Sequence, residues 1–335
     1  MPGNPHFPLP ARAAVFFWLI EMQNRLTLGI ICVVVGAAVF SVQDAVIKAI
    51  SGGYPVTEAI ALRAIVALPI LSLLVHFDSG LGKIVSPRFG WLTLRAMIQF
   101  FSYTSYYLAI AAMPLADAVA LFFVAPLVIV VLAWPVLGER VSWQVLAAVC
   151  VGLAGVVVML DPGDGVFEWA ALLSVGAAVA YATSQIIARK ISDSETAPVM
   201  SFYQNGVYLA GALLVAGVFA SLGVIDAPHP RLQVLVPPWQ WPTVTDALLM
   251  GSCGVIAAIG MVLLTQAYRL APANSVAPFE YVGILWPPLW GFVFFAEVPQ
   301  ARTVLGAAII VGAGLFALGA GRRRTVVVTP QPSPT

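Results

Sequence analysis

The sequence predicts an all-α integral membrane protein with ten transmembrane helices arranged as two inverted five-helix repeats. The composition, the spacing of the apolar segments and a weak internal repeat lead to this prediction. Of the 335 residues, 61% are hydrophobic and only 9% are charged, whereas a soluble domain typically has about 25% charged residues. So little charge cannot cover a globule in water, which excludes an ordinary soluble protein. The net charge of +1 gives no reason to expect nucleic acid as a partner.

Ten apolar segments follow one another, each of about 17–25 residues and each long enough to cross roughly 30 Å of hydrocarbon as a helix. We expect them at 26–49, 57–77, 91–112, 115–137, 142–160, 167–189, 197–221, 245–269, 273–296 and 301–320. Two connections are longer, at 78–90 and 222–244. The second holds Trp239 and Trp241, and tryptophan is typical of the membrane–water interface.

Residues 1–25 do not fit this series. Four prolines occur in the first ten positions, and the apolar run AAVFFWLI has about eight residues, which is too short for a span. A basic region and a cleavage site of a signal peptide are both lacking. We treat 1–25 as an N-terminal extension, and two interpretations stay open: translation starts at Met22, or the segment is a short interfacial helix.

Lysine and arginine predict the orientation, because they are more frequent in cytoplasmic connections. With the N-terminus inside, the inner face holds Arg12, Arg25, Lys83, Arg88, Arg140, Arg189, Lys190, Arg269 and Arg322–Arg324. The outer side keeps only Lys48, Arg63, Arg231 and Arg302. We therefore expect a multi-pass protein of the inner (plasma) membrane with both termini in the cytoplasm. Residues 322–335 are expected to form a basic cytoplasmic tail.

An internal repeat divides the chain into residues 26–160 and 161–321. At an offset of 158 residues the matches are Ala109 with Ala267, Pro114 with Pro272, Asp117 with Ser275 and Glu139 with Glu297. Nearer the start of each half the matches are Lys48 with Arg189, Asp44 with Gln185 and Arg63 with Gln204. Each half has five expected spans. Because five is odd, the halves insert in opposite directions, as in many secondary transporters.

Several segments are similar to a known family. PLADAVALFFVAPLVIVVLAWPVLGERVSWQVLAAVCVGLAGVVVML resembles the EamA domain of the drug/metabolite transporter (DMT) superfamily, and APFEYVGILWPPLWGFVFFAEVPQARTVLGAAIIVGAGLFAL resembles it again. FSVQDAVIKAISGGYPVTEAIALRAIVALP is similar to its first helical pair. The second copy departs from the pattern, because Ala296–Glu297 stands where the family has Gly–Glu.

The resemblance covers roughly residues 26–321. It implies ten spans in two inverted repeats, a central cavity and secondary transport of small polar metabolites. Family members similar in the APFEY region include carriers of riboflavin, of S-adenosylmethionine and of amino acids. The sequence leaves two alternatives open: a vitamin or cofactor uptake carrier, or an amino-acid or metabolite exporter.

Charged residues inside spans are functional candidates, because a charge in a membrane helix is costly unless it is paired or hydrated. Asp44 and Arg63 both lie about 9 Å from the outer end of their helices, at 1.5 Å per residue. We expect them to meet across a short hairpin, with Lys48 one turn above Asp44 and level with Glu58. The cluster is interpreted either as responsive to substrate or protons, or as a structural ion pair.

Glu280 lies about seven residues into its span, too deep for its short side chain to reach the surface. We expect it to line the cavity or to relay protons, since a carboxyl group that takes up and releases a proton can couple proton movement to substrate movement. Arg95 enters its span from the same side at a shallower depth. Its long side chain is expected to reach the membrane surface, and a partnership with Glu280 is the alternative.

Uncharged polar residues complete the expected pathway. Gln99, Tyr103 and Tyr106 share one helix face by their spacing, and tyrosine rings suit a planar or zwitterionic solute. Further candidates are Gln185, Gln204, Asn205, Tyr281 and Trp286. The alternative interpretation is that such residues hold helices together through hydrogen bonds.

Other residues are expected to be structural. Asp117 and Ser275 follow Pro114 and Pro272 and are of types favoured at helix N-caps. Glu139 and Glu297 are expected in turns on opposite membrane faces. Prolines such as Pro126, Pro278 and Pro287 are expected to kink the fourth and ninth spans and to permit gating.

Together these features predict a secondary active transporter that moves a small polar or amphipathic metabolite by alternating access, with protons as the coupling ion. The expected partners are a small-molecule substrate and the lipid bilayer, and the chain is expected to be a monomer or homodimer. No cofactor or metal is expected, because no Cys/His spacing typical of a metal site occurs. A membrane enzyme is a distant alternative, since it would need clustered catalytic groups and His6, His76 and His229 are all peripheral. A channel or scaffold is another.

Overall fold

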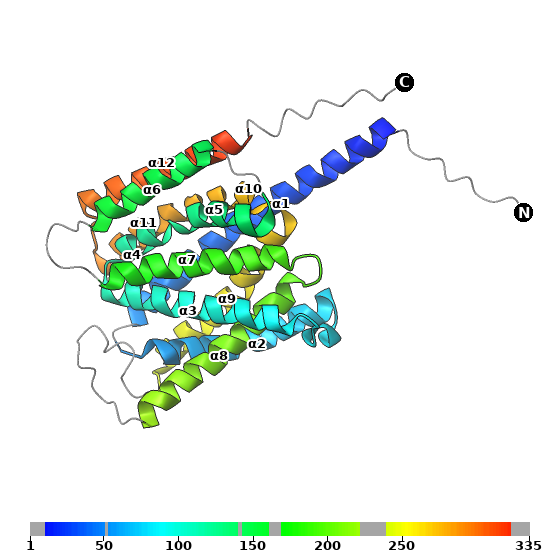
Figure 1. The fold of residues 1–335 in the computed structure, drawn as a ribbon. Helices are drawn as coiled ribbons and strands as arrows, with labels where there is room; N and C mark the ends of the chain where they lie inside the picture. The colour runs from blue at the N-terminus through cyan, green and yellow to red at the C-terminus, as the bar shows by residue number, and fades with distance from the viewer. Residues whose placement is uncertain (1–10, 51–52, 140–142, 161–168, 222–238, 323–335) are drawn as a thin grey trace, which may run out of the picture.

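The computed structural model describes residues 11–50, 53–139, 143–160, 169–221 and 239–322, and they form a bundle of helices (Figure 1). The α-helices of the first half are α1 (Ala11–Ile50), α2 (Val56–Asp78), α3 (Phe89–Ala112), α4 (Leu115–Phe122), α5 (Ala125–Leu137) and α6 (Trp143–Leu160). Those of the second half are α7 (Trp169–Lys190), α8 (Ala197–Ser221), α9 (Val244–Leu270), α10 (Ala273–Val276), α11 (Trp286–Phe295) and α12 (Ala301–Arg322). Two 3-10 helices are η1 (Leu81–Ile84) and η4 (Ala277–Leu285). The described part of the chain contains no strand.

Each apolar segment expected from the sequence coincides with helical structure. Within the described residues, six helical stretches are long and apolar enough to cross a membrane: Asn24–Ile50, Val56–Asp78, Leu115–Leu137, Trp169–Lys190, Ala197–Ser221 and Val244–Leu270. Ala301–Phe316 is a shorter apolar helix. The helix α3 does not reach this level of hydropathy because Arg95, Gln99 and a series of Ser, Thr and Tyr residues interrupt its apolar sequence.

The N-terminal extension does not form a separate interfacial helix over its described part. The helix α1 begins at Ala11 and continues without a break to Ile50. Residues 1–10, the connection at 222–238 with Arg231, Arg140 and the tail from residue 323 lie outside the described residues.

The fourth and ninth segments are broken, as the prolines predicted. The helix α4 ends at Phe122 and α5 begins at Ala125, directly before Pro126. In the ninth segment, the 3-10 helix η4 carries Pro278 near its start, and α11 carries Pro287 near its start. Proline lacks an N–H and its ring clashes with the preceding turn, so an α-helix is interrupted there. These breaks bend the backbone beside the interior of the bundle.

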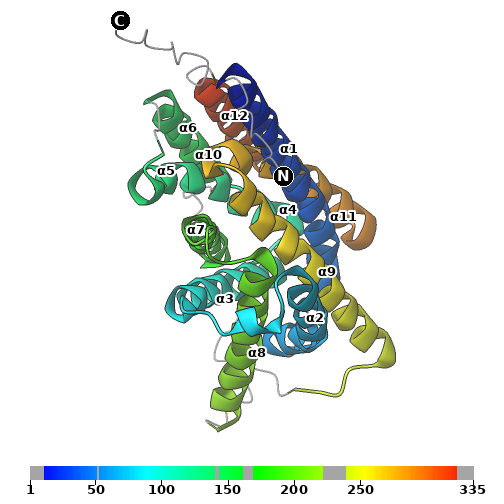
Figure 2. The ribbon, with the colours of Figure 1, turned by 90° about the vertical axis from the view of Figure 1, so that its right-hand side faces the viewer.

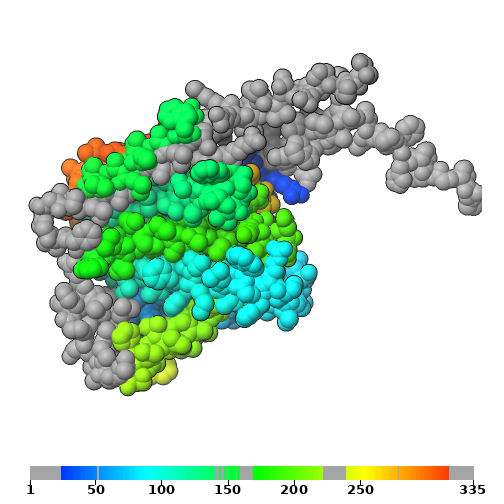
Figure 3. Space-filling model, viewed as in Figure 1, coloured from blue at the N-terminus to red at the C-terminus, as the bar shows by residue number. Residues whose placement is uncertain are grey.

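The helices pair in a regular manner. The helix α1 packs along α9, and α3 packs along α7; α6 packs on α12, and α2 packs on α8. In Figures 1 and 2 the pair α6–α12 forms one edge of the molecule, and α2, α3 and α8 lie at the opposite edge. The space-filling view shows α3, α7 and α8 as a continuous surface on one face (Figure 3). The helix α4 is mostly buried between these layers, whereas much of α11 is exposed.

The helices α5 and α11 end in the same way. Gly138 follows α5 with φ 70° and Ala296 follows α11 with φ 53°, and both angles are in the left-handed region. The next N–H closes the turn in each case: Glu139 donates to the carbonyl of Ala133 at 3.2 Å, and Glu297 donates to that of Gly291 at 3.0 Å. Ala296 is the only residue other than glycine with positive φ among the described residues.

The predicted N-caps were wrong. Pro114 and Pro272 occupy the N-cap positions of α4 and α10, and neither supplies a side-chain hydrogen bond. Asp117 accepts a hydrogen bond from the Thr303 hydroxyl instead, and the Ser275 hydroxyl contacts the Asn274 side chain at 3.1 Å. Both residues lie inside the first turn because the preceding proline already fixes the helix start.

Two glutamates cap these helices from the opposite half of the chain. The N–H of Leu115, at the start of α4, donates to Oε2 of Glu297 at 3.0 Å. The N–H groups of Ala273 and Asn274, at the start of α10, donate to Oε1 and Oε2 of Glu139 at 3.3 Å each. A carboxylate stabilises the positive end of a helix dipole. The arrangement is reciprocal, since each half of the chain caps a helix in the other.

Candidate functional site

A partly open cavity of about 150 Å³ lies between the helices of the bundle. It is bounded by α1, α3, α7, α8 and α9 and by the two broken segments. The charged side chains in its wall are Asp44, Arg95 and Glu280, and the polar amides are Gln43, Gln99, Gln185 and Gln204. The remaining wall is largely aromatic and aliphatic. A cavity of this volume has room for several water molecules.

Glu280 stands in η4, where the interrupted helix brings the carboxyl group against two neighbouring helices. Its Oε1 accepts a hydrogen bond from the Tyr181 hydroxyl of α7 at 2.8 Å and one from the Tyr268 hydroxyl of α9 at 2.6 Å. The side chain is buried and lines the cavity. Since both donors use Oε1, Oε2 is the oxygen left to take a proton or a solute.

Asp44 lines the cavity from α1 and is held by α3. Its Oδ2 accepts a hydrogen bond from the Tyr106 hydroxyl at 3.0 Å. Next to it, the Gln43 amide donates to the hydroxyls of Tyr103 and Tyr107 at 3.0 and 2.6 Å. These contacts connect one helix face of α3 to α1.

The prediction that Arg95 reaches the membrane surface was wrong. Arg95 is 1% exposed and points into the bundle, where it lines the cavity. Its Nη1 donates to the Gln204 side-chain oxygen at 3.0 Å, and its Nη2 donates to the Thr265 hydroxyl at 3.1 Å. Its two bonded nitrogens thus have neutral acceptors, not Glu280. The polar groups of α8 and α9 replace the water that an arginine would otherwise seek at the surface.

The predicted pair of Asp44 and Arg63 was also wrong. Arg63 is fully buried, and its three guanidinium nitrogens have no hydrogen-bond partner among the described residues. The guanidinium carbon lies 4.1 Å from the ring centre of Tyr103 and 4.9 Å from that of Tyr208. The reason is helix packing: α1 and α2 make few contacts with each other, since α1 packs mainly along α9 and α2 packs mainly along α8. The two residues therefore face different neighbours.

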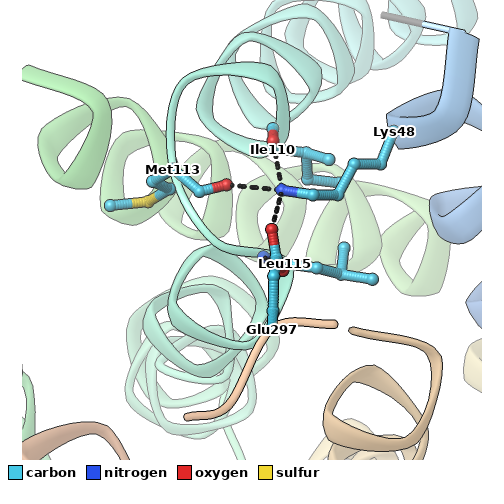
Figure 4. Close-up of polar contacts among 5 residues, drawn as sticks. All are labelled: Lys48, Ile110, Met113, Leu115 and Glu297. Carbon is cyan, nitrogen blue, oxygen red and sulfur yellow. Dashed lines mark hydrogen bonds and ion pairs between the residues drawn. The ribbon is translucent and has the colours of Figure 1, made fainter. Parts of the chain in front are cut away.

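The expected grouping of Lys48 and Glu58 beside them does not form either. Lys48 is paired with Glu297, at 2.9 Å between Nζ and Oε1. It also donates to the carbonyl oxygens of Ile110 and Met113 (Figure 4). Glu58 accepts a hydrogen bond from the backbone N–H of Gln240 at 3.2 Å.

The structure divides the predicted pathway residues into two groups. Those that line the cavity are Asp44, Gln99, Tyr103, Tyr106, Gln185, Gln204 and Glu280. Those that lie outside its wall are Arg63, Asn205, Tyr281 and Trp286. Asn205 donates to the sulfur of Met261 at 2.9 Å, Tyr281 stacks on Phe123, and Trp286 stacks on Trp290.

Three tyrosines and one arginine were missed as candidates. Tyr181 and Tyr268 hold Glu280, Tyr208 lines the cavity, and Arg95 is the cation in the wall. The spacing of helical neighbours could have found two of them: Tyr181 is four residues before Gln185, and Tyr208 is four after Gln204, so each pair shares a helix face.

This site can bind a solute and exchange protons. It presents carboxyl groups, a guanidinium, amides and hydroxyls around a space closed on several sides by aromatic rings. No group of three or more His, Cys, Asp or Glu side chains that could hold a metal ion occurs in the part of the chain that the structure describes.

The fold and this cavity define a class: a multi-pass, all-helical membrane protein with a polar chamber in its centre. Residues 27–161 match the model of the EamA-like transporter family. The pseudopaline exporter CntI of Pseudomonas aeruginosa is 28% identical over 86% of this chain and 95% of its own length. The riboflavin transporter of Vibrio cholerae is 29% identical over 75% of this chain and 77% of its own length. The S-adenosylmethionine uptake transporter of Rickettsia prowazekii is 29% identical over 67% and 69%.

A protein of known crystal structure shares the fold, with a TM-score of 0.66 and 19% identity over 88% of this chain and 99% of its own. The family match and the named relatives agree with the resemblance noted in the sequence. Residues 27–161 match an EamA domain, and the chain is similar over most of its length to named transporters of the drug/metabolite transporter superfamily.

Proposed function

We propose that this protein is a secondary active transporter that moves a small polar or amphipathic metabolite across the inner membrane by alternating access, coupled to protons. The observation that carries the proposal is Glu280, a buried carboxyl group in the wall of the cavity, which accepts hydrogen bonds from Tyr181 and Tyr268 on two other helices. The side chains that meet solute or protons are the seven cavity-lining residues predicted from the sequence, together with Arg95 and Tyr181.

A proton on Glu280 changes contacts across three elements at once. The ionised carboxylate only accepts hydrogen bonds, whereas the protonated form also donates one. Because Glu280 lies in the broken segment, a change in its bonds to α7 and α9 can move η4 relative to both helices. Asp44 with Tyr106 offers a second carboxyl group on the opposite half of the chain. These groups supply a route by which proton binding and the conformation of the bundle depend on one another.

The helix contacts support ten spans in two inverted five-helix repeats, over residues 26–160 and 161–321. Under the 158-residue match, Leu115 corresponds to Ala273 and Glu139 to Glu297, and these are the residues that cap one another reciprocally. The match of Lys48 with Arg189 relates α1 to α7, and the 158-residue match relates α3 to α9, so the pair α1–α9 corresponds to α7–α3; both pairs pack closely. Lys48 donates to the last carbonyls of α3, and its counterpart Arg189 donates to the carbonyl of Arg269, at the end of α9, at 2.8 Å. Alternating access in such folds is largely a rocking of one repeat against the other around a fixed site.

The distribution of basic residues supports cytoplasmic termini. Lys83, Arg88, Arg189, Lys190 and Arg269 lie at η1, the start of α3 and the ends of α7 and α9. These ends lie on the side of the bundle where α1 begins and α12 ends (Figure 1). By the positive-inside rule this side faces the cytoplasm. All walls of the cavity come from one chain, so a single protomer suffices for transport, as a monomer or within a homodimer.

The direction of transport is not fixed by the relatives, because one is named an exporter and another an uptake transporter. The cavity combines charged groups with a largely apolar wall, which suits an amphipathic metabolite. A riboflavin- or S-adenosylmethionine-type uptake carrier and an amino-acid or metabolite exporter are the two alternatives. A membrane enzyme has less support, because the described cavity has no group positioned as an activated nucleophile next to a base.

The test begins with a binding screen. A ligand that binds only the folded state raises its thermal stability, so purified protein is heated with riboflavin, S-adenosylmethionine and single amino acids. Compounds that stabilise the protein are then used in proteoliposomes with an imposed pH gradient. We expect accumulation that depends on the gradient.

Glu280→Gln is the informative variant in this assay, and Glu195→Gln, outside the cavity, is its matched control. Glu280→Gln should fold and exchange solute across the membrane but should not accumulate it with a pH gradient. Accumulation by Glu280→Gln equal to that of Glu195→Gln would contradict the proton-coupling role. Failure of the wild-type protein to transport any compound that it binds would contradict the proposed function itself.

A further inference from the structure

Two permanently charged side chains lie in the interior of the bundle without an acidic partner. Arg63 and Arg95 are 0% and 1% exposed. Arginine stays protonated in proteins, and a buried charge is strongly destabilising unless it is compensated. Neither guanidinium is bonded to a carboxylate among the described residues: Arg63 has no hydrogen-bond partner, and Arg95 bonds only to Gln204 and Thr265. Neither of these buried guanidinium groups is therefore paired directly with a carboxylate of the described residues.

The two arginines flank one part of the cavity wall. Gln204 accepts from Arg95 and donates to the Tyr208 hydroxyl at 3.0 Å. Tyr208 stacks on Tyr103, with ring centres 5.1 Å apart, and both rings line the cavity. Arg63 lies behind these two rings, over their faces. The wall thus has one cation on its surface, Arg95, and a second directly behind it.

Arg95 has hydrogen-bonding capacity to spare. A guanidinium carries five N–H donors, and only one bond each from Nη1 and Nη2 is used. Its Nε has no partner but is enclosed by protein atoms, so the donors left for a solute are the second N–H groups of Nη1 and Nη2. The acceptors on Gln204 and Thr265 fix the plane of the group, which leaves an edge able to hold two oxygens of a planar anion side by side. A guanidinium fixed in this way is suited to a carboxylate.

The rest of the wall indicates what such an anion is attached to. Phe40, Phe122, Phe123 and Leu264 line the cavity on other sides, so the body of the solute meets apolar surface. Asp44 and Glu280 also line it, and they disfavour an anion of higher charge such as a phosphate. One carboxylate on an apolar body fits this distribution best.

We propose that Arg95, supported by Arg63 behind the Tyr103–Tyr208 wall, forms an anion subsite that binds the carboxylate of an amphipathic solute. This inference rests on the proposed transport function and names the substrate class. Arg95 is the binding residue, and Arg63 adds positive potential through the aromatic wall without touching the solute.

The experiment measures thermal unfolding of the purified protein in detergent with three probes that each carry a phenyl group. They are phenylacetate, the uncharged amide phenylacetamide, and phenyl phosphate. The proteins compared are the wild type, Arg95→Gln, Arg63→Gln and the control Arg88→Gln. Arg88 is exposed at the start of α3, away from the cavity. Glutamine is already present at the position of the second repeat that matches Arg63, which favours folding of that variant.

We expect phenylacetate to raise the unfolding temperature of the wild type and of Arg88→Gln, and phenylacetamide to have no effect. Arg95→Gln should need at least about tenfold more phenylacetate for the same rise, because a charge-assisted bidentate contact is lost. Arg63→Gln should show a smaller loss. If Arg95→Gln does not fold, Arg95→Lys, which keeps the charge and loses the planar edge, should show a weakened response that still favours phenylacetate over the amide.

The inference is wrong if phenylacetate does not stabilise the wild type, if the amide stabilises it equally, or if Arg95→Gln responds like Arg88→Gln. A stronger effect of phenyl phosphate than of phenylacetate would overturn the assignment to carboxylates. Because the assay needs no transport, its failure is separate from that of the proposed function. If the protein transports solutes without an acidic group in proteoliposomes and does not bind phenylacetate, the proposed transport function stands and the carboxylate subsite is wrong.

Discussion

Lys48 and Glu297 form an ion pair, with 2.9 Å between Nζ and Oε1, at a junction of four helices. Lys48 comes from the end of α1 and donates to the carbonyls of Ile110 and Met113 at the end of α3 (Figure 4). Glu297 follows α11 and accepts the N–H of Leu115 at the start of α4. The cation therefore contacts the negative end of one helix dipole, and the carboxylate contacts the positive end of another.

Removal of this carboxylate should destabilise the protein. We expect Glu297→Ala to lower the free energy of unfolding by about 1–2 kcal/mol, the usual value of a helix cap, because the N–H of Leu115 loses its acceptor. Glu297→Gln keeps a side-chain oxygen for that N–H and should retain a part of the stability. Chemical unfolding in detergent measures the order, wild type above glutamine above alanine. An alanine variant as stable as the wild type would show that the cap is replaced by water.

Gly138 and Ala296, which precede Glu139 and Glu297, both have left-handed backbone angles. Substitutions at these two positions should change the stability of the protein in opposite directions. A residue other than glycine in the left-handed region is strained by roughly 1–2 kcal/mol, part of which is offset because glycine makes the unfolded chain more flexible. Ala296→Gly should therefore stabilise the protein by up to about 1 kcal/mol. Gly138→Ala should destabilise it by a similar amount. The comparison of unfolding temperatures checks both, and a loss of stability in Ala296→Gly would mean that the alanine methyl makes contacts worth more than the strain.

The sequence predicted the helical segments because their length and apolarity are local properties. The breaks in the fourth and ninth segments were also predictable, since proline acts on the turn in which it stands. The match of Glu139 with Glu297 and of Leu115 with Ala273 was visible in the repeat. That the capping contacts cross between halves was not, because an alignment relates positions without saying which of them touch.

The candidate site was predicted only in part, because the sequence shows which residues share a helix face but not which helices pack together. Gln99, Tyr103 and Tyr106 share a face of one helix, and that face does line the cavity. The pairing of Asp44 with Arg63 assumed that consecutive helices pack on each other. In the structure the long contacts of α1 are with α9, about two hundred residues later. Arg95 was misplaced because only the fold provides Gln204 and Thr265 as buried acceptors.

The hydroxyls of Tyr181 and Tyr268, which both donate to Glu280, should make coupled contributions to the free energy of unfolding. Tyr181→Phe and Tyr268→Phe each remove one O–H donor and should each cost about 1 kcal/mol of stability. In either single variant the carboxyl group keeps the other donor. The double variant leaves it without both, so the loss should exceed the sum of the single losses. A double-mutant cycle on unfolding free energies measures this coupling, with Tyr203→Phe, which bonds to Ile84 at the edge of the bundle, as control. Strictly additive losses would show that the two hydroxyls act independently of Glu280.

The close crossing of α2 and α9 predicts that two glycines of α9, Gly254 and Gly251, respond differently to substitution by alanine. A Cβ on Gly254 would lie 2.6 Å from the carbonyl oxygen of Arg63 and 2.6 Å from Cβ of Val66, whereas a Cβ on Gly251 would meet only Val66, at 3.9 Å. Both atoms near Gly254 belong to one stretch of α2 and cannot move without the helix. Gly254→Ala should therefore push α2 away from α9 and lower stability by about 1–3 kcal/mol. Gly251→Ala should be neutral or stabilise the protein by up to about 1 kcal/mol, since alanine restricts the unfolded chain.

The displacement of α2 in Gly254→Ala should also be detectable in ligand binding. Arg63 lies on the shifted stretch of α2, so its guanidinium would leave the faces of Tyr103 and Tyr208, which line the cavity. Gly254→Ala should thus alter ligand-induced stabilisation as well as unfolding, and Gly251→Ala should alter neither. Equal stability of the two variants would contradict this prediction, because it would mean that α2 moves away from α9 at little cost.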